Sequence, residues 1–449
     1  MATIFRPRTL VLFAGDLFFF TLALFITLFL RAFEPPSWGL FLEHLQPFSI
    51  LFALWLGVFF VAGLYESRSI ILARRALSTS LLGAQTVNIS VAALFFFFVP
   101  WFGISPKTIL FIYLIVSFLS ILLWRVSVFP RLGIQKSEEA LVVGNRPEVK
   151  ELAHALAHAP FAPVRMVEVI DPSSVSLTKD VAEALKAHRV RFIIADFGDP
   201  SVSHAFPDMY NFLSAGVRFF DAMALYEEVF GRIPLSILDD RWFARNVSRY
   251  SHTLYDPLKR IMDITVAAVG GTLSLVFYPL IILAIKLEDR GPAIIAMTRV
   301  GEGGKIFKFY KFRSMSGNDN AEYGAQGTTT LKVTWVGKFL RVSRLDELPQ
   351  FWNVLKGDLS LIGPRPEAPS LVELYEKEIP YYGVRHLIKP GISGWAQLYH
   401  DNHPHHGAEV GATREKLSYD LYYLKHRSLA LDGIIVLKTL KKLFARSGV

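Results

Sequence analysis

Two adjacent carboxylates are the residues of this chain with the clearest capacity for chemistry. Asp346 and Glu347 stand in the run Arg341-Val-Ser-Arg-Leu-Asp-Glu-Leu-Pro-Gln350. Proline is tolerated in the first turn of a helix, so Pro349 predicts a short helix from about Asp346 to Leu355 that ends at the glycine two residues later. A carboxylate at the positive end of a helix dipole stays ionised, and it can act as a nucleophile or as a cation ligand.

Arginines close to the two acids favour a phosphate as their partner. Arg365 stands between Pro364 and Pro366, whose fixed φ angles reduce the entropy that the guanidinium loses when it binds an oxyanion. The alternative is a capped surface helix with ordinary charges, because helix starts are commonly acidic. The two acids by themselves do not decide between these interpretations.

The composition is that of a membrane protein. Of 449 residues, 52% are hydrophobic and only 19% are charged, and 37 are phenylalanine. The absence of cysteine excludes disulfides, thiolate zinc sites and iron–sulfur clusters, which leaves oxygen ligands and a hard cation such as Mg²⁺ as the expected metal chemistry. In so apolar a chain, a net charge of +9 suits anionic lipid or phosphorylated substrates better than nucleic acid.

Four apolar stretches near the N-terminus approach the length of about 20 residues that crosses a bilayer. They are Leu10–Leu30, Phe48–Tyr65, Ser80–Trp101 and Thr108–Trp124. We therefore expect a four-helix transmembrane bundle over residues 1–130. Basic residues gather before the first stretch and after the second and fourth, which places both ends of the bundle in the cytoplasm. The first stretch lacks a small-residue cleavage site, so we expect it to remain as an anchor.

Short apolar runs alternate with helical segments between residues 138 and 240. The runs are Ala140–Gly144, Val164–Ile170, Arg191–Asp196 and Val217–Phe220. This alternation predicts a small Rossmann-like α/β domain with a parallel sheet. Gly144-Asn-Arg-Pro-Glu148 occupies the first strand-to-helix turn, but the later glycines of a dinucleotide fingerprint are missing. A regulatory or dimerising domain is therefore expected, with nucleotide binding as the alternative.

The apolar segment Ile264–Leu287 is long enough to cross the membrane, but its flanking charges favour both ends on the same side. Those charges are Lys259, Arg260, Lys286 and Arg290. Pro279 removes an N–H and clashes with the carbonyl four residues back, so a bend is expected. We predict a re-entrant membrane hairpin over about residues 262–287, with a true fifth span as the alternative.

A series of motifs follows from Lys259 to the C-terminus. In order they are Lys-Arg-Ile-Met-Asp263, Arg-Val-Gly-Glu-Gly-Gly304, Lys-Phe-Arg-Ser-Met315, Leu-Asp-Glu-Leu-Pro-Gln350, Gly-Asp-Leu-Ser-Leu-Ile-Gly-Pro-Arg-Pro366, Lys-Pro-Gly-Ile-Ser-Gly-Trp-Ala-Gln397 and Tyr-Asp-Leu-Tyr-Tyr423. Together they resemble the bacterial sugar transferase family, the monotopic phosphoglycosyl transferases. With the four spans and the α/β insert, the chain is similar to the large branch that transfers galactose- or glucose-phosphate, and the resemblance covers essentially the whole chain.

The resemblance implies a reaction. A UDP-hexose gives its sugar-1-phosphate to polyprenyl (undecaprenyl) phosphate, which yields polyprenyl-diphosphate-sugar and UMP as the first lipid-linked step of an exopolysaccharide, capsule or O-antigen. The family implies a multi-pass protein of the bacterial inner membrane, with a mainly helical catalytic domain, residues 255–449, on the cytoplasmic face. It also implies that Asp346 is the nucleophile, forming an aspartyl phosphosugar, and that Glu347 positions Asp346 or Mg²⁺.

Further residues are expected to bind the substrate phosphates. Period-2 alternation in the strand 305–313 puts Lys311 and Arg313 on one face, and the resemblance favours a diphosphate there over a solvated strand edge. Arg341 and Arg365 are the other expected phosphate ligands. Asp420 is expected to be a second acidic contributor whose role is open, with a helix-surface charge as the alternative.

Some features depart from the family pattern or stand apart from it. The family usually has Gln where this chain has Met297, and Asp-Pro-Arg where it has Thr-Leu-Lys332, which affects fine substrate contacts. Histidines 400, 403, 405 and 406 are typical of a surface or substrate-lid loop more than of a metal site. The segment Ser428–Phe444 predicts a basic amphipathic helix, for which a lipid surface and core packing are equally good partners.

Two other functions fit parts of the sequence. A glycosyltransferase would release UDP, but no Asp-x-Asp motif is present. A membrane sensor or channel gated by the α/β domain would leave the Leu-Asp-Glu-Leu-Pro-Gln350 block without a role. Because of the extra bundle and insert, we expect a homodimer.

Overall fold

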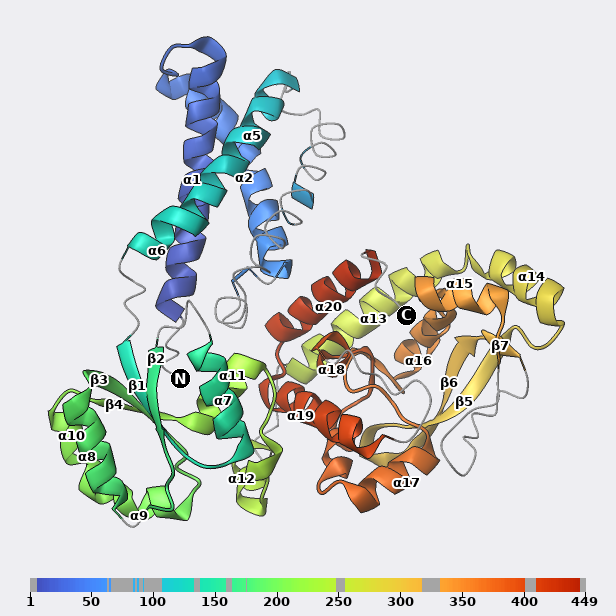
Figure 1. Cartoon of the computed structure of the whole chain (residues 1–449). Helices are drawn as coiled ribbons and strands as arrows, with labels where there is room; N and C mark the ends of the chain where they lie inside the picture. The colour runs from blue at the N-terminus through green and yellow to red at the C-terminus, as the bar shows by residue number, and fades with distance from the viewer. Residues whose placement is uncertain are drawn as a thin grey trace. The chain divides into compact units, whose positions relative to one another are not determined.

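The computed structural model describes residues 6–62, 64–65, 84, 87–88, 92, 107–132, 138–158, 164–174, 176–247, 255–316, 332–399 and 409–444. The chain separates into two compact units, Met1–Phe230 and Gly231–Val449 (Figure 1). Its described part is mostly helical, with two candidate membrane helices and a small parallel sheet.

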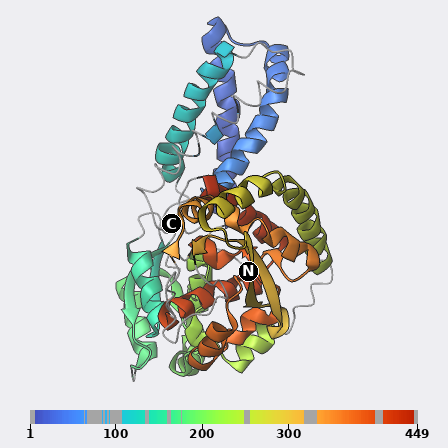
Figure 2. The ribbon, with the colours of Figure 1, turned by 90° about the vertical axis from the view of Figure 1, so that its right-hand side faces the viewer.

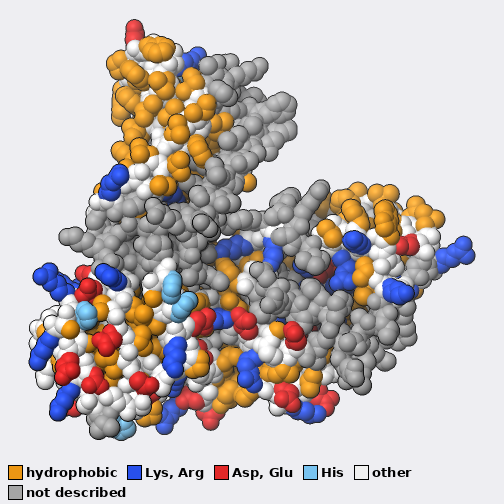
Figure 3. All heavy atoms as spheres, in the orientation of Figure 1, with side chains coloured by type: hydrophobic (Ala, Val, Ile, Leu, Met, Phe, Trp, Pro, Cys, Tyr) orange, Lys and Arg blue, Asp and Glu red, His pale blue; other side chains and the backbone are white. Residues whose placement is uncertain are grey.

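Two long helices open the first unit. They are α1 (Arg6–Ala32) and α2 (Trp38–Val61). Within them, Thr9–Ala32 and Trp38–Phe60 are long and apolar enough to cross a membrane. Hydrophobic side chains cover their outer surface in Figure 3, as expected where lipid replaces water. The first two predicted spans thus form helices that could cross a membrane, which fits a membrane-associated protein, although α2 begins at Trp38 and not at Phe48.

The fourth predicted span forms a shorter apolar helix. It consists of α5 (Lys107–Leu123), a π-helical turn (Trp124–Val128) and α6 (Phe129–Arg131), with the apolar stretch at Ile112–Val128. The third predicted span, Ser80–Trp101, lies outside the described residues except for positions 84, 87, 88 and 92.

A buried ion pair links these helices. Arg125 donates from Nε to Asp16 Oδ1 at 3.0 Å and from Nη2 to Asp16 Oδ2 at 2.5 Å, and Tyr65 donates to the same carboxylate at 2.5 Å. Arg125 also donates to the carbonyl of Leu64 at 3.1 Å. Charges in so apolar a setting persist only when they are paired, so this cluster fixes the register of α1 against the chain that follows α2 and α5.

A parallel four-stranded sheet follows in the order β2-β1-β3-β4. The strands are β1 (Glu138–Val143), β2 (Val164–Ile170), β3 (Val190–Ala195) and β4 (Arg218–Asp221). The helices are α7 (Pro147–Ala157), α8 (Leu177–Ala187), α9 (Pro200–Met209), α10 (Asn211–Ser214) and α11 (Ala222–Phe230). In Figure 1, α7 and α11 lie on one side of the sheet and α8 and α10 on the other. The predicted parallel sheet is confirmed.

The turn after β1 carries an arginine where a dinucleotide fingerprint would carry glycine. Arg146 Nε lies 3.2 Å from Asp196 Oδ2, across the point where the strand order reverses. Gly198 donates its N–H to the other oxygen of Asp196 at 3.0 Å. Burial raises the pKa of Asp196. Side chains of the domain itself therefore occupy the crevice in which such folds bind ligands.

The second unit begins with short helices and a bent pair. A 3₁₀ turn (Leu235–Ile237) and α12 (Asp240–Asn246) precede α13 (Tyr255–Ser274) and α14 (Tyr278–Asp289). The two long helices meet at 58°, and Pro279 lies in the first turn of α14, so the predicted bend is confirmed (Figures 1 and 2). Large apolar side chains are exposed along both helices and in the turn between them; they include Ile261, Leu273, Val276, Leu280 and Leu287.

A small β-hairpin and a set of short helices complete this unit. The hairpin is β5 (Ile294–Val300) and β6 (Ile306–Phe312), joined by a 3₁₀ turn (Glu302–Gly304). After it come β7 (Met315–Ser316), β8 (Lys332–Val333), α15 (Trp335–Ser343), a 3₁₀ turn (Leu345–Glu347), α16 (Gln350–Lys356), β9 (Ser360–Ile362), α17 (Pro369–Glu378), a 3₁₀ segment (Tyr382–Leu387), β10 (Gly391–Ser393), α18 (Trp395–Tyr399), α19 (Val410–His426) and α20 (Leu429–Phe444).

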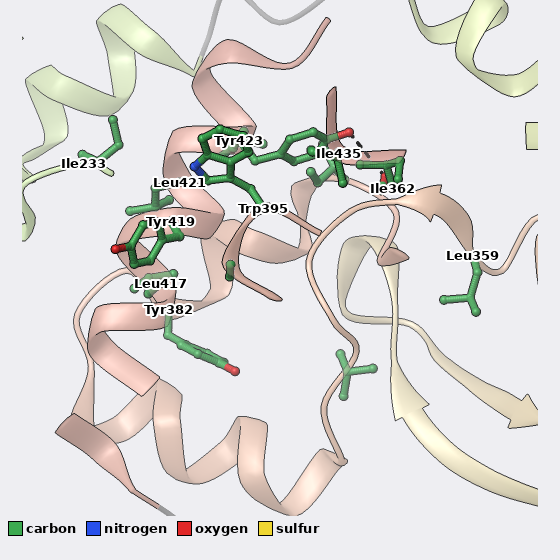
Figure 4. Close-up of a cluster of buried hydrophobic side chains, with 14 of the residues drawn as sticks. Ile233, Leu359, Ile362, Tyr382, Trp395, Leu417, Tyr419, Leu421, Tyr423 and Ile435 are labelled. Atoms are coloured by element: carbon green, nitrogen blue, oxygen red, sulfur yellow. Dashed lines mark hydrogen bonds between the residues drawn. The ribbon is translucent and has the colours of Figure 1, made fainter. Parts of the chain in front are cut away.

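The core of this unit lies between α19, α20 and β9 (Figure 4). Tyr423 donates to the carbonyl of Ile362 at 3.3 Å and to Asp432 Oδ1 at 2.7 Å. Ile435 is fully buried beside them. A lipid surface and the protein core were the two partners expected for the C-terminal helix. The buried face of α20 contacts the core.

Three glycines let the β9 and β10 backbones approach closely. Gly363 donates to the carbonyl of Ser393 and Gly391 to that of Pro364, both at 2.9 Å. A Cβ on Gly391 would overlap the backbone nitrogen of Gly363, and one on Gly394 would overlap the carbonyl of Gly363. The loop after β9, which carries Arg365, is thus held by main-chain contacts that tolerate no side chain.

Gly391→Ala should therefore lower the free energy of unfolding by more than about 2 kcal/mol, because the backbone must move to admit the methyl group. Chemical denaturation in lipid nanodiscs measures this. Gly433→Ala in α20 is the control: apart from the adjacent residues and the backbone of the same helix, no described residue has an atom within 4 Å of its Cβ position, so it should gain about 0.5–1 kcal/mol of helix stability. Equal stability of the two variants would contradict the close approach.

Candidate active site

Asp346 lies in a 3₁₀ turn between two helices. Arg344 ends α15 in the left-handed conformation, with φ 57°, and the chain then forms the 3₁₀ turn Leu345–Glu347 before α16. The single helix predicted from Asp346 is therefore wrong in its first turn. Pro349 has no N–H to bond the carbonyl of Leu345, so Leu348 bonds that carbonyl instead at 3.3 Å. α16 ends at Gly357 as predicted, with φ 93°.

Three cations surround Glu347. Its Oε1 lies 2.9 Å from Arg365 Nη2, 3.4 Å from Lys311 Nζ and 3.6 Å from Arg344 Nη1. Lys311 also lies 3.5 Å from Asp346 Oδ2. Residues from β6, from the 3₁₀ turn and from the loop after β9 thus meet in one cluster, with more positive than negative charge.

The two acids of this cluster have opposite electrostatic environments. Burial raises the pKa of Asp346, and Lys311 only partly offsets this effect. Burial would also raise the pKa of Glu347, but Arg365, Lys311 and Arg344 outweigh it and hold that pKa well below its usual range. We expected a helix dipole to keep Asp346 ionised. In the structure, the nearest group that favours its ionised form is Lys311, and burial opposes that effect.

Asp346 keeps one oxygen without a partner. Its side chain is only 6% exposed, and its Oδ1 makes no hydrogen bond to any described residue. Glu347 is fixed by three cations, whereas Asp346 presents a buried lone pair beside Lys311. Such an oxygen can accept a cation or attack an electrophile.

Asn353 in α16 sets the spacing between the acids and Lys311. Its Nδ2 donates to the carbonyl of Lys308 at 2.6 Å, and its Oδ1 accepts from the N–H of Tyr310 at 3.1 Å. The amide of Asn353 therefore fastens α16 to β6. Lys311, the next residue along the strand, is thereby held against the 3₁₀ turn that precedes α16.

The Lys-Arg-Ile-Met-Asp263 motif of α13 holds two further segments of the site. Arg260 donates to the carbonyls of Val354 and Leu355 at 2.7 and 2.9 Å, where a cation complements the C-terminal end of α16. Asp263 is buried and accepts the N–H of Leu361 in β9 at 3.0 Å. Helix α13 thus contacts both α16, which follows Asp346, and β9, which precedes Arg365.

Asp420 supports the loop of Arg365 through another arginine. It accepts from Arg385 Nε at 3.0 Å and from Nη2 at 2.8 Å, and Arg385 Nη2 also donates to the carbonyl of Arg365 at 3.0 Å. Asp420 and Arg385 are both buried. The alternative of a helix-surface charge is therefore wrong, and the described contacts of Asp420 make it a positioning residue.

Asp420→Asn should remove the carboxylate that is hydrogen-bonded to the buried Arg385 and leave Glu367 as the remaining acidic group that acts on this arginine. We expect the free energy of unfolding to fall by about 3 kcal/mol, or roughly 6–12 °C in melting temperature for a unit of this size. Turnover should fall as well, because Arg365 loses its support. Asp256→Asn removes a carboxylate that is 49% exposed and paired with Arg427, and it should cost at most about 1 kcal/mol. Similar melting temperatures for the two variants would refute the supporting role.

The predicted phosphate ligands do not all contact the two acids. Lys311 contacts both acids, and Arg365 contacts Glu347. Arg313 lies just beyond the end of β6, where its Nε donates to the carbonyl of Met315 at 3.2 Å and its guanidinium lies close to Gly291. Arg341 lies in the last turn of α15, and no hydrogen bond or ion pair joins its guanidinium to a side chain of the described residues.

Sequence reasoning missed two arginines of the site. Arg344 contacts Glu347, and its place one helical turn after Arg341 in the same motif was an available signal. Arg385 stands outside every motif that was recognised, so no local signal pointed to it. The four clustered histidines lie at positions 400–406, outside the described residues.

The metal ligands available are two carboxylates. Among the described residues, no group of three or more His, Cys, Asp or Glu side chains is placed to hold a metal ion. The unpartnered Oδ1 of Asp346 is a suitable oxygen ligand. This donor set fits Mg²⁺, which is commonly bound through one or two carboxylates and completed by substrate phosphates and water.

Comparison with known proteins agrees with this geometry. The family described as "Bacterial sugar transferase" matches residues 254–446. An Aeromonas hydrophila UDP-N-acetylgalactosamine-undecaprenyl-phosphate N-acetylgalactosaminephosphotransferase is 39% identical over 273 residues, which are 59% of this chain and 61% of the relative. The UDP-glucose:undecaprenyl-phosphate glucose-1-phosphate transferase of Escherichia coli K12 is 41% identical over 188 residues, which are 42% of this chain and 40% of the relative. That of Caulobacter vibrioides is 40% identical over 193 residues, which are 42% of this chain and 70% of the relative. The chain belongs to the bacterial sugar transferase family.

The family match lies within the second unit, and the relatives are matched over only part of their length. The matched part spans 61% of the length of the Aeromonas relative and 40% of that of the Escherichia coli relative. The matched residues 254–446 include Asp346, Glu347 and the cations around them.

Proposed function

We propose that this protein is a phosphoglycosyl transferase that moves hexose-1-phosphate from a UDP-sugar to undecaprenyl phosphate. The products are undecaprenyl-diphosphate-sugar and UMP. The observation that carries the proposal is the unpartnered, buried Oδ1 of Asp346 beside Lys311, in a cluster rich in arginine. The names of the relatives support the two substrates.

The reaction proceeds through two displacements at one phosphorus. Asp346 attacks the β-phosphorus of the UDP-sugar, the bond from that phosphorus to the bridging oxygen breaks, and UMP leaves with that oxygen. An oxygen of undecaprenyl phosphate then attacks the same phosphorus and displaces Asp346. The C1–O bond of the sugar stays intact in both steps, so the anomeric configuration is retained.

The basic residues stabilise the charge that phosphoryl transfer develops. Lys311 and Arg365 lie within 3.5 Å of the acids and can contact the phosphoryl oxygens. Glu347 acts mainly as the anion that gathers Lys311, Arg365 and Arg344. Arg313 and Arg341 remain candidates for the distal phosphates, and Asp420 positions the loop of Arg365.

Mg²⁺ is the cofactor that we propose, with Asp346 and Glu347 as the residues that would hold it. When bound, it would neutralise charge on the diphosphate. Lys311 and Arg365 orient the same phosphates whether or not the metal is present.

The membrane attachment suits a lipid substrate. We propose that residues 1–130 form the four-helix bundle and that α13 and α14 dip into one leaflet as a re-entrant hairpin, for which the 58° bend and the exposed apolar side chains are the support. The flanking charges favour the cytoplasmic face of the bacterial inner membrane. The α/β domain would then be a regulatory or dimerising insert of a homodimer, in an enzyme that initiates a surface polysaccharide.

One assay tests this function. Membranes that contain the protein are incubated with undecaprenyl phosphate and, separately, UDP-glucose, UDP-galactose or UDP-N-acetylgalactosamine, and the released nucleotide is identified. We expect UMP with at least one sugar. Release of UDP would favour a glycosyltransferase that moves the bare sugar, and no nucleotide release with any sugar would favour the sensor or channel.

A further inference from the structure

Gln350, the first residue of α16, is a fully buried polar side chain without a partner. Its exposure is 0%, and neither Nε2 nor Oε1 makes a hydrogen bond to any described residue. Buried carboxamides are nearly always hydrogen-bonded, since an unpaired one destabilises the fold. A group that the fold leaves unpaired at this cost is a candidate for pairing with a ligand.

The helix geometry places Gln350 between two anchored neighbours. Leu348 and Pro349 have right-handed helical backbone angles, so the chain winds continuously from the 3₁₀ turn into α16. Asp346, Gln350 and Asn353 stand at i, i+4 and i+7 and therefore share one face.

Contacts at both ends show what that face meets. Asn353 bonds the backbone of Lys308 and Tyr310 in β6, and Asp346 lies 3.5 Å from Lys311 at the end of the same strand. Gln350 lies one turn from each of these two residues. Its side chain is thus directed toward β6, in the space next to the carboxylate of Asp346.

Asp346 is the second residue on this face with a buried polar atom that has no partner among the described residues, and that atom is Oδ1. Two buried polar groups without partners, one helical turn apart, are most simply explained by one shared ligand. The reacting phosphoryl group is the ligand that must reach Oδ1, and its oxygens accept hydrogen bonds. A carboxamide suits this position because it donates without adding charge to a cluster in which Lys311 and the arginines already supply it.

We propose that Gln350 is a further catalytic residue, whose Nε2 donates a hydrogen bond to a non-bridging oxygen of the phosphoryl group while that group is attached to Asp346. The proposal rests on the function proposed above. The bond forms as phosphorus moves onto Oδ1, so Gln350 acts on the transition state and the covalent intermediate and contributes little to binding of the intact UDP-sugar. No covalent bond to Gln350 is made or broken.

Gln350→Met tests this role, because it keeps the size of the side chain and removes its polar atoms. We expect the melting temperature of the ligand-free protein in nanodiscs to stay the same or rise, since an unpaired buried amide is lost. We expect kcat for UMP release to fall about 10²-fold, as when one oxyanion donor is removed, with KM for the UDP-sugar nearly unchanged. The phosphosugar adduct should form more slowly in a single turnover.

Asn353→Leu is the matched contrast on the same helix face. Its amide is buried and fully paired with β6, so its loss should lower the melting temperature by several degrees. A fall of the same size for Gln350→Met would mean that Gln350 has a structural partner, such as a buried water, and would overturn the proposal. So would an unchanged kcat in a folded Gln350→Met protein whose wild type releases UMP. If the wild type releases no UMP, the proposed function fails and this role fails with it.

Discussion

Asp346→Asn should reduce UMP release by at least about 10⁴-fold and abolish the covalent phosphosugar adduct. The asparagine has nearly the same shape, so the ion pairs of Glu347 should survive, but the amide has no carboxylate oxygen to attack phosphorus. Loss of a nucleophile commonly removes most of the rate enhancement of an enzyme that uses one. Intact-protein mass spectrometry after incubation with UDP-sugar alone, without lipid, detects the adduct directly.

The control for this substitution is Asp240→Asn. Asp240 lies exposed in the first turn of α12, in the same unit of the chain, and the same chemical change there should leave the rate of UMP release within about twofold. An Asp346→Asn protein that still forms the adduct would remove Asp346 from its assigned role. An adduct found on Glu347 in that variant would transfer the role to its neighbour.

Lys311→Met should lower kcat by about 10²–10³-fold and also shift the pH dependence. Lys311 is a described cation that contacts both acids, and it lowers the pKa of Asp346 against the effect of burial. Without it the pKa of Asp346 rises further. The carboxylate is then protonated over a wider range, so the acidic limb of the pH–rate profile should move to higher pH.

Two variants separate charge from position at Lys311. Lys311→Arg keeps the charge, so its acidic limb should stay near that of the wild type even if kcat falls. Lys305→Met removes an exposed lysine one residue before β6 and should change neither quantity. A Lys311→Met enzyme with an unmoved acidic limb would show that ionisation of Asp346 does not limit the rate at low pH.

The sequence pattern correctly predicted the parallel sheet and the bend between α13 and α14, because both depend on residues that are close together in the chain. The alternation of apolar runs was sufficient for the parallel sheet, and Pro279 was sufficient for the bend between α13 and α14. The first turn at Asp346 was missed because it depends on the conflict between Pro349 and the carbonyl of Leu345. The packing of the Phe351 ring against Gly270 likewise depends on residues that are distant in sequence.

In the candidate site, too, residues in recognisable motifs were predicted, and residues whose roles depend on distant contacts were missed. Lys311 and Arg365 were found because each stands in a motif, and the structure brings both to Glu347. Arg385 was missed because its role depends on contacts with Asp420 and with the carbonyl of Arg365, which are distant in sequence. The burial of Gln350 was equally invisible, since a glutamine at the start of a helix is ordinarily solvated.

The contacts of α13 have a further consequence for how this protein can be handled. Arg260 and Asp263 stand less than one turn apart, and they bond the end of α16 and the strand before Arg365. The spacing between the nucleophile segment and the phosphate-binding loop is therefore set on the same helix that continues into the apolar bend. If α13 and α14 lie in the membrane as we propose, a change in bilayer thickness that tilts α13 also changes that spacing, and the lipid around the protein becomes a determinant of its active-site geometry.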